Sequence, residues 1–194
     1  GTVQIANSDD FQYTYLNQNN SNLYGAFAAK YPGTIGNSLS VSVCSKGSEF
    51  DTWDYKSYFT SAPGTSDYVS NAGGSNDEMH VVVIDNSGMW TGVAGSILEK
   101  FAFVSKASDN KKQDGTNNYY KDVINGRSEW LWWMDHTDQI EVSVANSNWG
   151  NAMAGTDFHS MTDSLTQSLS GGFDDATATD AQTQEAFHLF SNAE

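Results

Sequence analysis

The sequence predicts an α+β domain with a mostly antiparallel, β-sandwich-like core of about six strands and short flanking helices. Several short segments alternate apolar and polar residues, as half-buried strands do. Loops rich in Gly, Ser, Asn and Asp separate these segments, and helical spacing of apolar residues is confined to short stretches. Strands joined by turns and loops pair antiparallel, so the short helices are expected beside the sheet and not between its strands.

Composition excludes several classes of protein before any motif is considered. The 194 residues include 24 acidic and 9 basic side chains, for a net charge of −15, with six Trp, nine Tyr and ten Phe. A single Cys cannot form an internal disulfide or a multi-Cys zinc site. The negative charge opposes nucleic-acid phosphates, and no apolar run approaches the roughly 20 residues of a membrane helix. We therefore expect an acidic, aromatic-rich globular domain without nucleic-acid partners or membrane insertion.

Two helices are expected near the beginning of the chain. In residues 8–17, Asp9 and Asp10 occupy the first turn, where negative charge is favourable, and aromatic residues follow at helical spacing. Residues 21–30 place apolar side chains on one helical face. The second helix is expected to end at residues 31–33, because Pro32 removes a backbone donor and restricts the residue before it.

The central part of the chain predicts a strand and a hairpin. Residues 37–46 alternate, with Leu39, Val41 and Val43 on one face and serines on the other. After a long loop at 61–77, the sequence predicts strands at 80–84 and 89–93 around a four-residue turn, and a further strand over 101–104.

The second half predicts three further elements around polar loops. Residues 119–125 favour a short helix that follows a polar loop at 107–118, with Gly126 as its C-terminal cap. Apolar side chains on both faces of residues 128–134 are typical of a buried strand, and residues 139–145 alternate as another strand. After irregular residues 146–160, a capping box formed by Thr179 and Gln182 opens a last helix.

No arrangement of residues in the sequence points to catalysis. The four His stand in no metal-binding spacing, and neither a Gly-x-Ser-x-Gly nucleophile elbow nor a phosphate-binding loop is present. Adjacent acids such as Asp174 and Asp175 imply nothing without geometry. We therefore expect no catalytic, cofactor-binding or metal-ligating residues, and no enzyme.

The tryptophans leave two functions open. Trp90, Trp130, Trp132 and Trp133 could form a sugar-stacking platform of a carbohydrate-binding β-sandwich module. Core packing is the favoured interpretation, because the segment around Trp132 is apolar on both faces, as in a strand that is covered on both sides.

The basic residues are concentrated in one part of the chain. Residues 100–127 carry six basic and three acidic side chains, whereas residues 128–194 carry 11 acidic and no basic ones. The basic island is a solvated loop or, alternatively, a contact with an acidic neighbour such as another copy of the chain. Its members, the candidate subunit contacts, are Lys100, Lys106, Lys111, Lys112, Lys121 and Arg127.

Residues 30–43, which read KYPGTIGNSLSVSV, resemble a segment of the contractile tail sheath proteins of myovirus-type bacteriophages. In that family a similar run leads into a strand. Physically, Pro32 ends the preceding helix, Gly33 and Gly36 allow tight turns, and the alternation that follows specifies a strand.

A second motif strengthens the resemblance. Residues 168–174, which read SLSGGFD, resemble the element at which a sheath chain passes into its central conserved domain, with Gly171 and Gly172 at the crossing. The expected helix at 180–190 matches the helix that follows this element. One departure is Asp175-Ala176 directly after this element, where the family often has another Gly.

The resemblance implies a structural protein of the virion and a domain division. Residues 1–170 would form a peripheral sheath domain, and residues 171–194 the crossing segment and the first helix of a truncated next domain. The chain would be made in the bacterial host cytoplasm and reside in the phage tail. Its partners would be other sheath copies in a helical array and, through parts of the protein not present here, the tail tube and baseplate. The isolated piece is expected to be monomeric and to need no cofactor, and its acidic surface to lie on the outer side.

Overall fold

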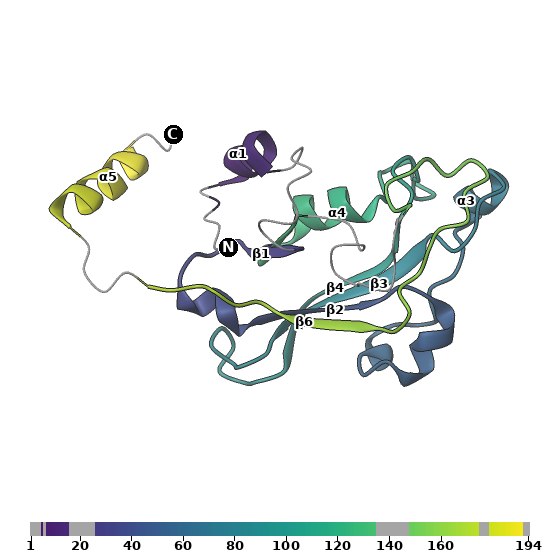
Figure 1. The fold of residues 1–194 in the computed structure, drawn as a ribbon, viewed down its shortest axis with the longest axis horizontal. Helices are drawn as coiled ribbons and strands as arrows, with labels where there is room; N and C mark the ends of the chain where they lie inside the picture. The colour runs from purple at the N-terminus through teal and green to yellow at the C-terminus, as the bar shows by residue number, and fades with distance from the viewer. Residues whose placement is uncertain (1–4, 6, 16–25, 135–147, 175–178, 192–194) are drawn as a thin grey trace.

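The computed structural model describes residues 5, 7–15, 26–134, 148–174 and 179–191, and it forms two antiparallel sheets with short helices around them (Figure 1). The larger sheet has the strand order β4-β3-β2-β6 and the smaller one pairs β1 with β5. The six strands confirm the predicted α+β class. Their bounds are β1 Phe27–Ala29, β2 Leu39–Cys44, β3 Glu78–Asp85, β4 Ser96–Ser105, β5 Leu131–Trp133 and β6 Leu165–Ser168.

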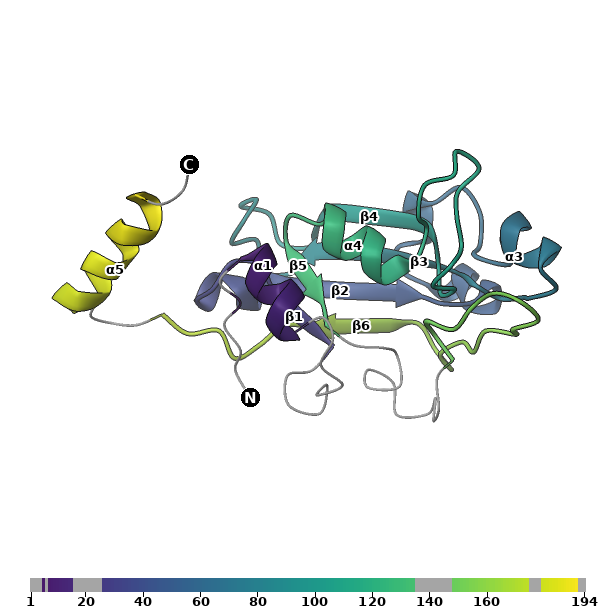
Figure 2. The ribbon, with the colours of Figure 1, turned by 90° about the horizontal axis from the view of Figure 1, so that it is seen from above.

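The helical segments are short, and most of them flank the sheets. The α-helices are α1 Ser8–Asp10, α3 Asp67–Asn71, α4 Tyr120–Arg127 and α5 Asp180–Ser191. The other helical turns are η1 Phe11–Tyr15, η2 Thr34–Ser38, η3 Gly47–Thr52 and η4 Lys56–Tyr58. Seen from above, α4, α1 and the two-stranded sheet lie over the larger sheet, and α5 lies apart from it (Figure 2).

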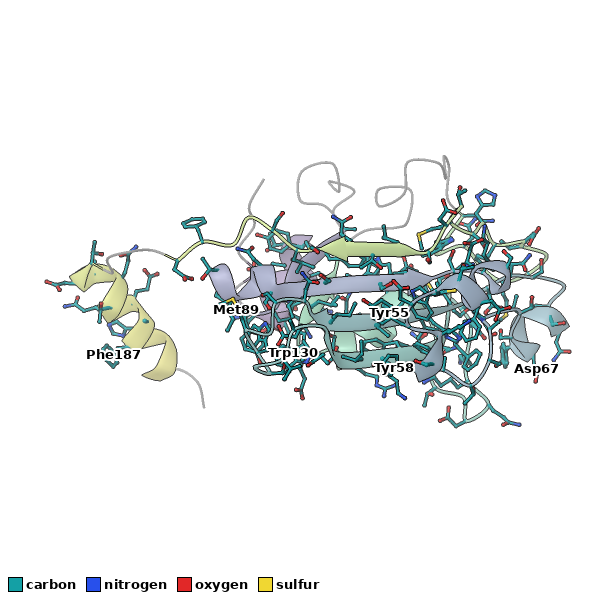
Figure 3. All side chains as sticks on the ribbon, turned by 90° about the horizontal axis from the view of Figure 1, so that it is seen from below. Tyr55, Tyr58, Asp67, Met89, Trp130 and Phe187 are labelled. Atoms are coloured by element: carbon teal, nitrogen blue, oxygen red, sulfur yellow. The ribbon has the colours of Figure 1, made fainter. Side chains whose placement is uncertain are left out.

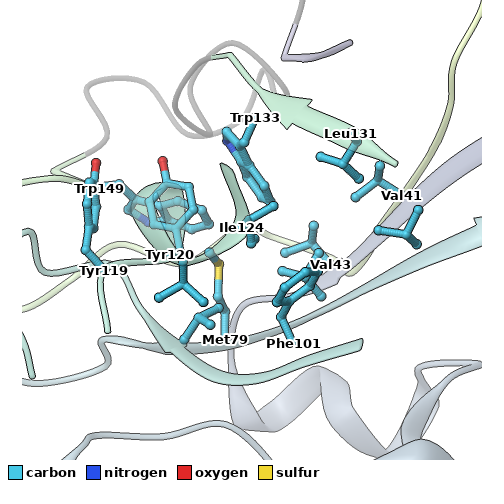
Figure 4. Close-up of a cluster of buried hydrophobic side chains, with 14 of the residues drawn as sticks. Val41, Val43, Met79, Phe101, Tyr119, Tyr120, Ile124, Leu131, Trp133 and Trp149 are labelled. Atoms are coloured by element: carbon cyan, nitrogen blue, oxygen red, sulfur yellow. The ribbon is translucent and has the colours of Figure 1, made fainter. Parts of the chain in front are cut away.

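The main core lies between the larger sheet and a layer made of α4 and the smaller sheet (Figure 4). Leu39, Val41 and Val43 point into it from β2, as their alternation predicts. The ring of Tyr120 on α4 meets the ring of Trp133 on β5 edge to face, with centroids 4.8 Å apart. Both side chains are completely buried. Aromatic side chains contribute most of the apolar area here, because each buries more surface than an aliphatic one.

The opposite face of the larger sheet is also covered. The serines of β2 point to this side, and the indole N–H of Trp53 donates a 2.8 Å hydrogen bond to the hydroxyl of Ser42. Trp53 follows η3 and packs with Cys44, Val82 and Ile84. All six residues of β2 are therefore buried, including the serines.

The smaller sheet is covered on its outer side by the N-terminal helical segment. Phe11 stacks on Trp132 with ring centroids 4.4 Å apart and an interplanar angle of 12°. The ammonium of Lys30, which follows β1, also lies over a Trp132 ring, 3.9 Å from the ring centroid. The strand over 131–133 is thus buried on both faces, as its sequence predicts.

Several predicted elements are confirmed within the described residues. Helical structure covers 8–15, and a strand covers most of 37–46. The Thr179 backbone N–H donates to the Gln182 side-chain oxygen at 2.8 Å, and the Gln182 N–H donates to the Thr179 hydroxyl at 3.3 Å. This reciprocal pair is the capping box that the sequence predicts at the start of α5. The strand expected at 139–145 lies outside the described residues.

The predicted helix over 21–30 is wrong at residues 27–29. These residues form β1, with Phe27 opposite Trp133 and Ala29 opposite Leu131. The ring of Phe27 packs edge to face on that of Trp133 at 4.7 Å. Pairing with β5 therefore overrides the local helical preference of these residues, which is weak compared with tertiary packing. Residues 21–25 lie outside the described part.

The predicted hairpin exists, but its second strand begins later than expected. Residues 89–93 are turns and bends, and β4 begins at Ser96, so residues 86–95 connect β3 to β4. The sequence also did not predict α3 within the loop at 61–77, β6 beside β2, or the helical turns η3 and η4. The β6 sequence, Leu-Thr-Gln-Ser, lacks the apolar alternation that identifies β2.

Gly126 does not cap α4, because the helix continues through it to Arg127 and Ser128 follows as the C-cap. A Cβ atom added at Gly126 would meet nothing within 4 Å, and its φ is not in the left-handed region.

Replacing Gly126 with Ala should therefore stabilise the protein by about 0.5–1 kcal/mol, since Gly in a helix interior loses more backbone entropy than Ala. Urea denaturation of both proteins measures the difference. Destabilisation by Gly126→Ala would show that this residue does serve as a cap.

Candidate functional site

The two motifs that carry the family resemblance lie against each other in space. We call residues 33–37 and 171–174 the clasp. The Asn37 carboxamide donates to the Gly172 carbonyl at 2.8 Å, and its oxygen accepts the Gly172 N–H at 2.8 Å. The Asp174 carboxylate accepts the Thr34 backbone N–H at 2.8 Å and the Thr34 hydroxyl. Four hydrogen bonds thus join segments that are about 140 residues apart in the sequence.

Glycine is required at the clasp by conformation and by space. Gly33 has φ +97° and Gly171 has φ +86°, and residues other than Gly rarely adopt such positive φ values. A Cβ on Gly172 would lie 2.2 Å from the Gly33 carbonyl oxygen, and one on Gly36 would lie 2.9 Å from the Ala29 Cβ. Pro32 precedes Gly33 in the turn that leads from β1 to η2. The glycines that were expected to form turns therefore also allow the two backbone segments of the clasp to approach closely.

The clasp determines where the chain leaves the sheet. β6 pairs with β2 from Leu165 to Ser168, and the Leu169 N–H then donates to the Leu39 carbonyl at 2.9 Å. The next residues follow the 33–37 segment and lead away toward α5, which lies beyond this end of the domain (Figure 1). Hydrogen bonds from Thr34 lower the pKa of Asp174, so its carboxylate form is favoured.

The connection at 86–95 is held beside the clasp by one buried carboxylate. Asp85 Oδ2 accepts hydrogen bonds from the Trp90 N–H at 3.0 Å, the Thr91 N–H at 2.8 Å and the Thr91 hydroxyl at 2.9 Å. Its Oδ1 accepts from the Ser38 hydroxyl at 2.5 Å and the Gly88 N–H at 3.0 Å. Burial would raise the pKa of Asp85, but these donors together lower it to about 2. The carboxylate therefore bends residues 88–91 inward, which prevents the strand predicted at 89–93.

The structure contradicts a sugar platform on Trp132 and Trp133. Trp133 is completely buried and Trp132 is 6% exposed. Trp90 and Trp130 are only partly buried, but their rings meet edge to face at 74°, with centroids 4.7 Å apart. Two rings at this angle offer no common flat face for stacking on a sugar. The tryptophans serve packing, as both apolar faces of the 130–133 segment indicate.

The basic island does not form one surface. Lys106 is completely buried, so it is not available for a subunit contact, and this part of the prediction is wrong. Lys100 points to the side of η4, where its ammonium donates to the Tyr58 carbonyl at 3.3 Å. Lys121 and Arg127 lie on α4, which covers the opposite face of the sheet. The remaining two, Lys111 and Lys112, lie in the loop at 107–118.

Lys106 instead joins three loops in the interior. Its ammonium donates to the Ser45 carbonyl at 2.8 Å, the Asn76 carbonyl at 2.7 Å and the Ser160 hydroxyl at 3.2 Å. Burial lowers its pKa from 10.5 to about 7, although the nearby Asp77 carboxylate acts in the other direction. A lysine was expected at the surface, and only the structure reveals the two carbonyls and the hydroxyl that accept its hydrogen bonds.

The described part of the chain shows no cluster of metal-ligating side chains. Residues 5–15, 26–134, 148–174 and 179–191, apart from the undescribed Ala6, hold no group of three His, Cys, Asp or Glu placed to bind a metal ion. Burial raises the pKa of the Cys44 thiol to about 11. Among these residues no helix is long and apolar enough to cross a membrane. The clasp and the adjoining loop, which hydrogen bonds hold together, are the candidate functional site.

Comparison with known proteins gives a partial match. No family model matches the chain. A curated protein, the tail sheath protein of Salmonella phage ViI, is 34% identical to it over 71 residues. These residues are 37% of this chain and 9% of that protein, so the matched region is less than a tenth of the relative's length.

Thr34 and Asn37, which bond across the clasp, were not predicted as functional residues, and Asp174 was considered only as one of two adjacent acids. All three stand inside the two motifs, beside the glycines that were singled out. The sequence signal for these residues is a hydrogen-bonding side chain placed among the glycines of a turn. Its partner could not be predicted, because the two motifs are far apart along the chain.

Replacing Asn37 with Ala should loosen the clasp while the sheet remains folded. The Gly172 N–H and carbonyl would lose their partners, and such a loss costs about 1–3 kcal/mol for a buried group. Hydrogen exchange should show the Gly172 amide exchanging about ten to a hundred times faster. Ser170→Ala, at an exposed neighbouring position, is the control and should leave exchange unchanged. Equal protection in both variants would contradict the role of Asn37.

Lys106 should make the free energy of unfolding depend on pH. Because its pKa is about 7 in the folded chain and 10.5 when exposed, the unfolded chain binds more protons between these values. Stability should therefore rise from pH 7 to 8.5, by at most about 1.4 kcal/mol per pH unit.

Urea denaturation at several pH values measures this slope, which Lys106→Met should remove and Lys111→Met, at an exposed lysine, should keep. The contradicting result is a slope that survives Lys106→Met.

Proposed function

We propose that this chain is part of a contractile bacteriophage tail sheath protein. The observation that carries the proposal is the 34% identity to the tail sheath protein of Salmonella phage ViI over 71 residues. The clasp supports it, because the two sheath-like motifs form one structural feature in which each needs the other. A chance match to either motif alone would not require them to meet.

The proposed role is structural. Many copies would surround a rigid tail tube in a helical array, with the longer protein also reaching the tube and baseplate. Contraction would convert one packing of the copies into another of lower free energy and drive the tube through the host envelope. The buried Lys106, the inert Cys44 and the hydrogen-bonded Asp85 all serve packing, as expected of a rigid part of such an assembly.

The proposal divides the chain at the clasp. Residues 1–170 would be a peripheral domain of the sheath protein, and residues 171–194 would lead through the clasp into the helix that opens the next domain. The exposed side chains of residues 179–188 fit this division, since α5 is not covered by the domain that precedes it. A net charge of −15 favours a place on the outer, solvated side of the array.

Antibodies raised against the 194-residue chain test the proposal. Immunogold electron microscopy of the phage that encodes the chain should place gold along the whole tail sheath, in extended and in contracted tails. An antibody against a capsid protein of the same phage is the control. Gold on the capsid or fibres, or tails without gold, would refute the sheath assignment.

A further inference from the structure

Residues 47–61, which we call the cover, lie on the face of the larger sheet opposite the main core. The cover contains η3 and η4, and its aromatic side chains pack against the sheet. Figure 3 shows Tyr55 and Tyr58 of the cover over the strands. His80 on β3 points to this face and is completely buried. Its imidazole stacks on the ring of Phe59, with ring centroids 4.2 Å apart and an interplanar angle of 13°.

Both nitrogens of the His80 imidazole bond to backbone groups, and these partners determine which nitrogen carries the proton. The Phe103 N–H donates to Nδ1 at 3.1 Å, so Nδ1 carries no hydrogen. The proton is therefore on Nε2, which donates to the Ser61 carbonyl at 2.8 Å. The neutral ring thus joins β4, through Phe103, to the end of the cover, through Ser61.

The bond to Nδ1 supports a strained part of β4. Two residues of β4, Ala102 and Phe103, lie opposite the single residue His80 of β3, which makes a β-bulge. Phe103 has φ +53°, a value that residues with a bulky side chain rarely adopt. The Asn118 carboxamide donates to the Phe103 carbonyl at 2.9 Å. Side chains of His80 and Asn118 therefore hold the two polar backbone groups of the strained residue.

A proton on Nδ1 is incompatible with this arrangement. An imidazolium donates from both nitrogens, so two N–H groups would point at each other between His80 and Phe103. The positive charge would also be buried among aromatic rings, away from water. Burial lowers the pKa of His80, although the bond to the Ser61 carbonyl acts in the other direction. Protonation therefore favours a form in which the ring has left this site.

No charged side chain in the described part of the chain bonds to the imidazole, whose two partners are backbone groups. Glu78 and Lys100, on the neighbouring strands, bond to other backbone groups. Burial raises the pKa values of the Cys44 thiol, opposite His80 on β2, and of the Tyr55 hydroxyl, so both are neutral. The charged residues of the elements packed around His80 are Glu49, Asp51, Asp54 and Lys56 on the cover, Glu78 on β3 and Lys100 on β4.

We propose that His80 is an acid-sensitive switch, which holds the cover on the sheet in its neutral form and releases the cover when Nδ1 is protonated. The main core lies on the other face of the sheet, so it stays folded when the cover leaves. Opening exposes the apolar side chains of Val82 and Ile84. The inference goes beyond the proposed sheath function and does not depend on it, because it concerns a contact within one chain.

The switch acts in a pH range that other groups leave largely free. The ordinary pKa of His is 6.5, and the pKa of His80 in the closed form is lower. The open form therefore binds the proton preferentially, and the closed form loses stability as the pH falls from about 6.5 to 5. Carboxylates with a lowered pKa, such as Asp85, act at lower pH, and Lys106 acts above this range. Burial raises the pKa of Glu78, whose effect on stability has the opposite sign.

NMR of the unchanged chain, labelled with nitrogen-15 at histidine, tests the state of the ring. At about pH 7.5 the His80 signals should show a hydrogen on Nε2 and none on Nδ1. Titration should give a pKa below the ordinary value of 6.5. A hydrogen on Nδ1 at neutral pH would overturn the proposal. So would a pKa of 6.5 or more, which would show that the aromatic rings stabilise the cation in place.

Hydrogen exchange tests the release of the cover. As the pH falls from about 6.5 to 5, the opening equilibrium constant of amides 53–59 should rise by up to about tenfold per pH unit, after correction for the intrinsic exchange rate. Amides of β2 and α4 should keep their protection. His80→Asn does not titrate, and its side-chain oxygen can accept the Phe103 N–H, so this variant should abolish the dependence. His159→Asn, at an exposed histidine, is the control and should keep it.

Protection of the cover that does not change with pH would overturn the proposal. So would opening of the main core together with the cover, or a pH dependence that survives His80→Asn. If His80→Asn does not fold, the titration and the exchange of the unchanged chain decide. None of these results bears on immunogold labelling of the tail, which tests the sheath function separately.

Discussion

The reciprocal hydrogen bonds between the Asn37 side chain and the Gly172 backbone join the beginning and the end of the domain. Asn37 stands just before β2, which pairs with both β3 and β6. Gly172 follows β6, so the bonds close the sheet where the chain leaves it. A Cβ at residue 172 would collide with the Gly33 carbonyl, so the two segments can approach this closely only with Gly at position 172. The contact thus continues the pairing of β6 with β2 past the end of the strand and sets the direction in which the chain leaves.

Buried polar groups fix the loops at the two ends of the sheet. At the clasp end the Asp85 carboxylate organises residues 88–91, and at the other end the Lys106 ammonium joins loops through Ser45, Asn76 and Ser160. Each charged group is costly to bury and is surrounded by several hydrogen-bonding partners. The result is a domain whose loops are held at both ends of the sheet, which suits a part that must keep its shape within an assembly.

The sequence predicts the parts of this fold that depend on local patterns. The alternation of Leu39, Val41 and Val43, the two apolar faces of 131–133 and the capping box at Thr179 all lie where they were expected. Predictions were wrong where a contact outside the local hydrophobic pattern decides, whether the partner is distant in the sequence or only a few residues away. β1 is a strand because Trp133 and Leu131 pair with it, and 89–93 is a loop because Asp85 binds its backbone. The motif glycines were found, but the side chains that join the motifs were not, since their partners are about 140 residues away.

Cryo-electron microscopy of the extended tail of the phage that encodes this chain tests the central claim most directly. That claim is that the domain belongs to the sheath and is joined to the rest of its subunit through the closed clasp. The reconstruction should show, on the outer side of every sheath subunit, density that fits residues 26–134 and 148–174, with residues 171–174 against residues 33–37. A sheath without such density, or a domain from which residues 171–174 are detached, would contradict the account.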